Sequence, residues 1–169
     1  MSGLGRMTNG VVDIRLLAPA DWQVLRATRL RALSESPQAF TSHLNFELRW
    51  SEREWRQRFD AATSVVAIER GDVIGIAGLV GGQQPQEARH LESIWVAPTH
   101  RHRGVFRSLL NTVAEIGRRT GLTDLMLWVL EDNMVAQRVY ARLGFVPTGE
   151  RQPIDTGRRR FEKRLRLAI

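Results

Sequence analysis

The sequence predicts an α/β protein in which a mixed β-sheet of about seven strands carries helices on both faces. Short apolar or alternating segments, which are typical of strands, occur between segments of helical periodicity. Glycine or proline separates most of them. The resulting order, β-α-α-β-β-β-α-β-α-β-β, places a meander of three strands before strand–helix–strand units, which implies a mixed sheet.

The first half of the chain is expected to hold three strands and two helices. Pro37 ends the first amphipathic segment, and Ser51 with Glu54 three residues later forms a capping box that begins the second helix. Gly71 and Asp72 form a hairpin-type turn between two β-branched runs. The predicted strands are 11–17, 64–70 and 73–80, and the predicted helices are 21–36 and 51–62.

The second half is expected to alternate strands and helices. Val105, Leu109 and Val113 mark one face of a helix that follows Gly104 and ends at Gly121. Because a strand–helix–strand unit crosses over in the right-handed sense, the strands before and after this helix are expected to be parallel neighbours. The predicted strands are 88–97, 124–130, 144–150 and 159–167, the predicted helices are 104–121 and 133–143, and a turn is expected at 83–88.

Composition indicates one soluble domain. The chain has 169 residues, a hydrophobic fraction of 43% and a charged fraction of 25%, which are ordinary values for a globular protein. We expect a flexible lead at 1–10 and a single domain over 11–169. No apolar run reaches the roughly 18 residues of a membrane helix, and the first residues lack the apolar segment of a signal peptide. The absence of cysteine excludes disulfides and thiolate sites, and we expect a cytoplasmic protein.

Positive charge is the other feature of the composition. The formal net charge is +7, and Lys163 is the only lysine, so nearly all cations are arginines. Arginine binds phosphate through a planar fork and stays charged. The excess therefore favours an anionic partner, although a general compositional bias would produce the same number.

The stretch "VAPTHRHRGVF" gives this charge a location. Arg101, His102 and Arg103 stand between a strand end and Gly104, which opens a helix, and Arg107 follows in its first turn. The free N–H groups and positive end of a helix bind phosphate when the ligand can approach closely. A solvated basic turn and a nucleic-acid patch are the alternatives. P-loop and dinucleotide motifs are absent, and the four histidines form no H-x-x-x-H zinc pair, so no metal site is expected.

Two segments then carry a family resemblance. "SIWVAPTHRHRGVFRSLL" resembles the acyl-coenzyme A segment of the GNAT superfamily of N-acetyltransferases, with Arg101, Gly104 and the position of Phe106 in register. "EDNMVAQRVYARLGF" resembles the second family segment at Asn133, Ala136, Tyr140, Gly144 and Phe145, and "RATRLRALSESPQAF" resembles the N-terminal helix pair. The resemblance implies the GNAT fold, a twisted mixed sheet. Phe106 stands where the family has glycine or alanine, so its ring is expected to narrow the phosphate cradle or tilt the ligand.

The resemblance implies transfer of an acetyl group from acetyl-CoA to a primary amine of a small molecule or peptide by direct attack. Tyr140 is then the expected proton donor to the departing thiolate. Glu92 is the first candidate for the base, directly or through a water, followed by His90 and Glu131. The cofactor-binding residues would be Ile94, Trp95, Val96, Arg101, His102, Arg103, Gly104, Val105, Phe106, Arg107, Ser108, Asn133 and Tyr140.

The acceptor pocket is harder to infer. Phe40, which follows the first helix, and Trp128 are the substrate-binding candidates, among aromatic residues that also suit a core. The resemblance also implies a homodimer, since many relatives form dimers. Two other functions stay open: a non-catalytic acyl-CoA-binding or regulatory domain, and a nucleic-acid-binding module. Neither of these explains why Asn133 and Tyr140 occur together.

Overall fold

A computed structural model describes residues 11–81, 89–154 and 160–169. The described residues form a seven-stranded mixed sheet with the strand order β1-β2-β3-β4-β5-β7-β6, which confirms the predicted fold class. The strands are β1 (Asp13–Leu16), β2 (Ala62–Glu69), β3 (Asp72–Val80), β4 (His90–Val96), β5 (Asp124–Leu130), β6 (Val146–Pro153) and β7 (Phe161–Ala168). The helices of more than three residues are α1 (Trp22–Glu35), α2 (Leu44–Glu47), α3 (Glu52–Asp60), α4 (Val105–Arg119) and α5 (Met134–Arg142).

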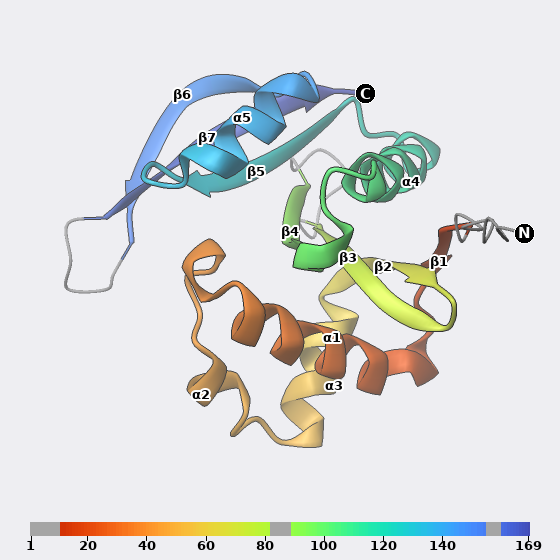
Figure 1. Cartoon of the computed structure of the whole chain (residues 1–169). Coiled ribbons are helices and arrows are strands. Elements are labelled where there is room, and N and C mark those ends of the chain that lie inside the picture. The colour runs from red at the N-terminus through yellow and green to blue at the C-terminus, as the bar shows by residue number, and fades with distance from the viewer. Residues whose placement is uncertain (1–10, 82–88, 155–159) are drawn as a thin grey trace, which may run out of the picture.

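Helices cover both faces of the sheet. Figure 1 shows α1 and α3 below the strands β2–β4 and α4 above them. The hydrophobic core lies between these layers, where Val65, Ile76, Leu109 and Leu127 are fully buried. Helix α5 packs beside the start of α4, since the rings of Phe106 and Tyr140 lie 5.9 Å apart.

Strands β4 and β5 are parallel neighbours, as predicted, but they stay together for only a short distance. Within the part of the chain that the structure describes, His90 and Met126 form their one paired position. By contrast, β5 pairs with β7 along its whole length, and β3 pairs with β4 from Gly75 to Val80. Figure 1 shows the arm of β5, β6 and β7 leading away from β4. The second half of β4 therefore has a free backbone edge.

A bulge in β4 accompanies this separation. Ile76 pairs with Trp95 and Gly78 pairs with Glu92, so three steps along β4 oppose two steps along β3. Ser93 lies inside the bulge and has a φ of 54°, a left-handed conformation that costs a non-glycine residue energy. An extra residue of this kind bends a strand and redirects its side chains. The side chains of Glu92 and Trp95 consequently share one face of the sheet.

Most predicted element bounds agree with the structure to within a few residues, but the segment between the first two long helices differs. The one-turn helix α2 was not predicted, because four residues are too few to display helical periodicity. Strand β1 is shorter than the predicted 11–17, and β6 continues to Pro153 instead of ending at 150. The expected lead at 1–10 and the turn at 83–88 lie outside the described residues.

Gly104 permits the turn that leads into α4. It is the N-cap residue, its φ is +78°, and a Cβ at this position would meet no heavy atom within 4 Å. We expect Gly104→Ala to lower the free energy of unfolding by about 1 kcal/mol through conformational strain alone. Gly104→Asn is the control, because asparagine tolerates this region better and should cost less. Urea unfolding of both variants measures the difference, and equal losses would contradict it.

Candidate active site

One large cleft opens where β4 and β5 separate. It has a volume of about 1370 Å³, and its walls come from the end of α1, the segment 38–42, β4, the turn before α4, the end of β5 and the start of α5. Every residue predicted to contact a cofactor or acceptor lines this cleft, except Arg103 and Ser108. The cleft thus collects residues that are more than 100 positions apart in the sequence.

The turn before α4 presents backbone donors to the cleft. His102 (φ 60°) and Gly104 (φ 78°) are both left-handed, and no side chain caps the helix. The N–H groups of the first turn consequently lack intrahelical partners and form an anion-binding end. The N–H of Ser108, one of the predicted cofactor-binding residues, donates to the Gly104 carbonyl at 3.1 Å and is used within the helix.

The arginines of this turn act mainly as internal anchors. Arg101 donates from Nε to the Val96 carbonyl (3.1 Å) and from Nη2 to Ser36 Oγ (2.8 Å). Arg103 binds Glu69 at the end of β2, with Nη2 2.6 Å from Oε1. The hydrogen bond from Arg103 holds the pKa of Glu69 below its usual range, so Glu69 stays ionised. These contacts connect the turn to the end of β4, to the residue after α1 and to the end of β2, although the side chains of the turn are exposed.

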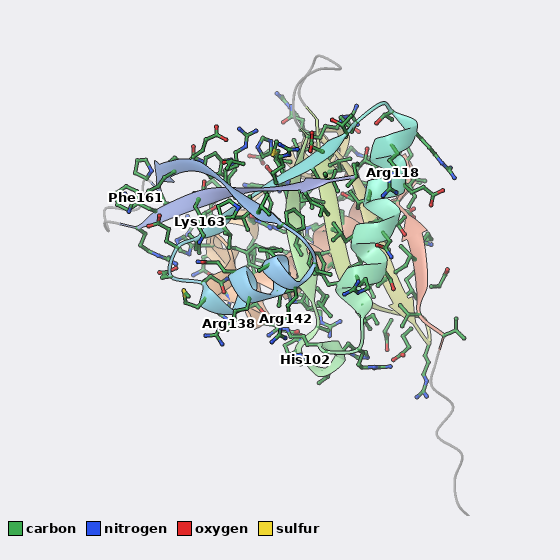
Figure 2. All side chains as sticks on the ribbon, turned by 90° about the horizontal axis from the view of Figure 1, so that it is seen from above. His102, Arg118, Arg138, Arg142, Phe161 and Lys163 are labelled. Carbon is green, nitrogen blue, oxygen red and sulfur yellow. The ribbon has the colours of Figure 1, made fainter. Side chains whose placement is uncertain are left out.

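Arg101 and Arg107 of this turn border the cleft, together with His100 and His102. Figure 2 shows His102 in the turn before α4 and Arg142 on the neighbouring helix α5, on the same side of the molecule. Arg142 also lines the cleft. Positive charge is therefore concentrated around the exposed helix end, where an anionic ligand would gain most from it.

Tyr140 lies at the back of the cleft between two other rings. It is 9% exposed, and its ring centroid is 5.9 Å from that of Phe106 and 5.5 Å from that of Phe145. Burial raises the pKa of the Tyr140 phenol, so the hydroxyl keeps its proton at every ordinary pH. The ring of Phe106 packs against Tyr140 of α5. The backbone N–H groups in the first turn of α4 can donate hydrogen bonds whatever side chain residue 106 carries.

Asn133 caps α5. Its Oδ1 accepts a hydrogen bond from the Ala136 N–H at 3.1 Å, which is the usual role of asparagine at an N-cap. Asn133 also lines the cleft. Since the oxygen is used for capping, the amide NH₂ is the group that this side chain can offer to a ligand.

His90 and Glu92 occupy alternate positions on β4 and both line the cleft. Nε2 of His90 is buried and has no hydrogen-bond partner among the described residues. Burial, and then the Arg164 guanidinium, lower the pKa of His90 from its ordinary value of 6.5, although the charges of Glu92 and Glu150 act in the opposite direction. The imidazole is therefore neutral at physiological pH and able to accept a proton.

Glu92 is not a free carboxylate. Arg58 of α3 donates from Nη2 to Glu92 Oε2 and to Ser93 Oγ, both at 3.1 Å. Sequence reasoning missed Arg58. The spacing of Arg58 within α3 was the available signal. Trp55 and Phe59 are buried on one face of this helix, and Arg58, three residues after Trp55, lies at the margin of that face.

A second ion pair, also missed from the sequence, is buried in the wall of the cleft that α1 and α2 form. Arg29 of α1 binds both oxygens of Glu47, with Nη2 2.8 Å and Nε 3.0 Å from them. Burial opposes ionisation of Glu47, but the hydrogen bonds and charge of Arg29 outweigh it and hold its pKa below the usual range. The guanidinium also lies 4.6 Å from the ring centroid of Phe40, so the predicted pocket residue Phe40 lies beside this pair.

Of the two remaining candidates from the sequence, Trp128 and Glu131, one lines the cleft and the other does not. Trp128 lines the cleft, with the Arg164 guanidinium 5.9 Å from its ring centroid. Glu131 does not line it, because its carboxylate binds Arg151 at 2.6 and 2.9 Å. Among the described residues, no group of three or more histidines and acids could hold a metal ion, and no helix is long and apolar enough to cross a membrane.

Comparison with known proteins agrees with this geometry. The model of the Acetyltransferase (GNAT) family matches residues 29–145. This range begins in the middle of α1 and includes the strands β2–β5, the whole turn before α4, and the helices α4 and α5. The chain belongs to the GNAT family of acetyltransferases. The seven-stranded sheet with its separated fourth and fifth strands is thus a GNAT fold.

Individual relatives are more distant. A streptothricin acetyltransferase from Streptomyces lavendulae is 34% identical over 90 residues, covering 53% of this chain and 47% of the relative. The chain thus spans about half the length of that relative. A GNAT-family acetyltransferase structure from Streptococcus pneumoniae superposes with a TM-score of 0.77 at 20% identity, covering 94% of this chain and 99% of the other. An acetyltransferase from Salmonella typhimurium, solved with its cofactor acetyl-CoA, gives a TM-score of 0.68 at 21% identity, covering 94% of each chain.

The buried ion pair of Arg29 and Glu47 makes a testable contribution to stability. We expect Glu47→Gln to lower the free energy of unfolding by about 3 kcal/mol, because removing one partner leaves a buried, uncompensated guanidinium. Glu52→Gln is the matched control, since Glu52 also pairs with an arginine but on an exposed helix surface, where little change is expected. Urea unfolding at neutral pH measures both. Equal losses of unfolding free energy in Glu47→Gln and Glu52→Gln would show that Arg29 forms hydrogen bonds with other groups when Glu47 is neutral.

Proposed function

We propose that this GNAT domain is an acyl-CoA-dependent N-acetyltransferase that moves an acetyl group from acetyl-CoA to a primary amine by direct attack. One observation carries the proposal: the free edge of β4 and the uncapped start of α4 open into the same cleft, with the protonated phenol of Tyr140 at its back. The free edge of β4 suits an extended arm that contains amides, and the start of α4 suits a pyrophosphate. The phenol of Tyr140 suits a departing thiolate, which requires a proton.

The chain's own residues suit acetyl-CoA. The β4 backbone from Ser93 to Val96 would pair with the amides of the pantetheine arm, as an added strand does at a sheet edge. The N–H groups of Gly104 to Arg107 would hold the pyrophosphate, with His102 and Arg107 beside it. Asn133 would donate its amide NH₂ to the arm. The Salmonella acetyltransferase of similar fold was solved with its cofactor acetyl-CoA, which supports acetyl-CoA as the ligand.

Tyr140 is assigned the role of general acid. When acetyl-CoA is bound, it supplies the thioester. The amine nitrogen then forms a C–N bond with the acetyl carbon while the C–S bond breaks. Tyr140 donates its proton to the sulfur, and because burial raises the pKa of this phenol, the proton is present at the start of every turnover.

His90 is assigned the role of general base, with Glu92 beside it. An amine must lose a proton to attack, and the unpartnered Nε2 of His90 can accept that proton through a water. Glu92, the first candidate from the sequence, shares its carboxylate with Arg58 and is better placed to orient the ammonium group. His90 and Glu92 thus place two polar side chains next to each other on β4, where both line the cleft.

We expect Tyr140→Phe to lower kcat about 100-fold or more, because it removes a general acid without removing the ring. The Kd for acetyl-CoA, measured by calorimetry, should change less than threefold. Phe145→Leu, which alters the neighbouring ring contact and leaves the phenol, is the packing control. A fully active Tyr140→Phe variant would remove the phenol from the mechanism, and binding without turnover by the wild type would favour a non-catalytic acyl-CoA domain.

The pH dependence of kcat/KM tests His90. The pKa of His90 is lowered from 6.5, so the imidazole is unprotonated above that value. Protonation at lower pH removes the acceptor, and kcat/KM should fall on acidification only below pH 6.5. His90→Gln should be at least tenfold slower at neutral pH and should lose this acidic limb. An unchanged acidic limb in His90→Gln would assign the proton to another group.

A further inference from the structure

The ion pair of Arg58 and Glu92 has properties that a purely structural pair does not need. Both side chains line the cleft, and they are 30% and 42% exposed. Only Nη2 of Arg58 takes part in its hydrogen bonds to described residues, at 3.1 Å to Glu92 and 3.1 Å to Ser93. The other guanidinium N–H groups of Arg58 are thus available to a ligand, and so is one oxygen of Glu92.

The position of the pair restricts which part of a ligand can reach it. Ser93 lies in the β4 bulge, beside the backbone that is proposed to hold the thioester arm. The attacking nitrogen must come within bonding distance of the acetyl carbon in the same place. A group of the acceptor that binds Arg58 must therefore be separated from the reacting nitrogen by only a few bonds.

The hydroxyl of Ser93 is oriented by two cations. It accepts from Arg58 at 3.1 Å and from Arg29 Nη1 at 3.4 Å. With its lone pairs facing two guanidinium groups, its own O–H is free to donate in another direction. Arg58 and Ser93 together offer N–H and O–H donors next to each other, which is what a carboxylate binds best.

The acids of the cleft are poorly arranged for a polycation. Among the described residues, the acids that line the cleft are Glu47, Glu92, Asp132 and Glu162. Glu47 is buried against Arg29, Asp132 binds Arg160 at 2.9 and 3.0 Å, and Glu162 accepts a hydrogen bond from Gln152. A polyamine would have to compete with a guanidinium group for Glu47 and for Asp132. Glu92, by contrast, keeps an exposed side next to a cation. A ligand with one positive and one negative group matches the Arg58–Glu92 pair without separating it.

We propose that the acceptor is a zwitterion of the α-amino acid type, in which the primary amine and a carboxylate are attached to the same carbon. The carboxylate binds Arg58 and the Ser93 hydroxyl, and the ammonium group faces Glu92 before it gives up its proton. This inference rests on the proposed acetyltransferase function and narrows it to a substrate class. Phe40 and Trp50, which line the same end of the cleft, lie where the rest of the acceptor would extend.

The test measures acetyl-CoA-dependent thiol release with matched amines. The panel holds several amino acids, including phenylalanine, leucine and methionine, together with the amine that each gives on decarboxylation and its carboxamide. Spermidine and kanamycin represent polycations. The expected result is a kcat/KM at least tenfold higher for an amino acid than for its decarboxylated partner.

Variants of α3 locate the effect. Arg58→Gln should reduce the preference for the amino acid over its decarboxylated partner by about 10- to 100-fold, mainly through KM, because a charge-assisted hydrogen bond is lost. Arg58→Lys keeps the charge without the planar fork and should retain part of the preference. Arg56→Gln is the matched control, since Arg56 lies two residues away and pairs with the exposed Glu52, and it should leave the preference unchanged.

The outcomes separate this inference from the function on which it rests. Turnover restricted to decarboxylated amines, carboxamides or polycations would overturn the zwitterion and leave the acetyltransferase standing. Equal preferences in Arg58→Gln and Arg56→Gln would also overturn it. Thiol release with none of the amines, in a protein that calorimetry shows to bind acetyl-CoA, would overturn the proposed function and this inference together.

Discussion

The separation of β4 from β5 is the constraint on which the rest of the site depends. A parallel neighbour that paired along the full length of β4 would satisfy its backbone and leave no cleft. The bulge at Ser93 adds one residue to β4 at the point of separation, while β3 continues to pair beyond it. Meanwhile β5 remains paired with β7 throughout. Within the described residues, the sheet therefore divides into two halves, and the second half of β4 has an unpaired backbone edge that faces the cleft.

Two helices hold these halves in their relative positions. On one side, the Leu109 and Val105 side chains of α4 approach Gly75 so closely that a Cβ there would lie 3.1 and 3.3 Å from them. On the other side, Phe106 of α4 contacts Tyr140 of α5 edge to face. Helix α4 thus spans the division and presents its N-terminus at the mouth of the cleft. The ring of Phe106, which the sequence comparison marked as unusual, contributes to this contact between the halves.

The turn before α4 also connects the proposed cofactor end of the cleft with the proposed acceptor end. Arg101 joins the end of β4 to Ser36, the residue that follows α1. Arg29 and Glu47 then join α1 to α2, and Arg29 reaches Ser93 in the bulge. Two sets of hydrogen bonds, joined through α1, therefore connect the proposed pyrophosphate site with the proposed acceptor site. Such a network favours one geometry for both ligands, as direct transfer between them requires.

The sequence predicted the fold well because its signals are local. Apolar periodicity, the capping box at Ser51 and the glycines at 104, 121 and 144 each determine an element through its own residues. The residues of the proposed cofactor site could be named from the sequence because the family resemblance lies in two contiguous segments, which form one strand, one turn and two helix starts. The ion pairs of the proposed acceptor site could not be named in this way. Arg29, Arg58 and Ser93 come from three elements, and only the tertiary structure shows that they converge.

The charge of the chain illustrates this limit in a different way. A net charge of +7 suggests an anionic partner, yet Arg29, Arg103 and Arg160 are each bound to an acid of the chain itself. What decides ligand binding is the exposure and free hydrogen-bonding capacity of each pair. Arg29 and Glu47 are buried and mutually satisfied, so they orient their surroundings. Arg58 and Glu92 are partly exposed and incompletely satisfied, so they can recognise a ligand of matching polarity. The two pairs are chemically alike, and their different burial gives them different roles.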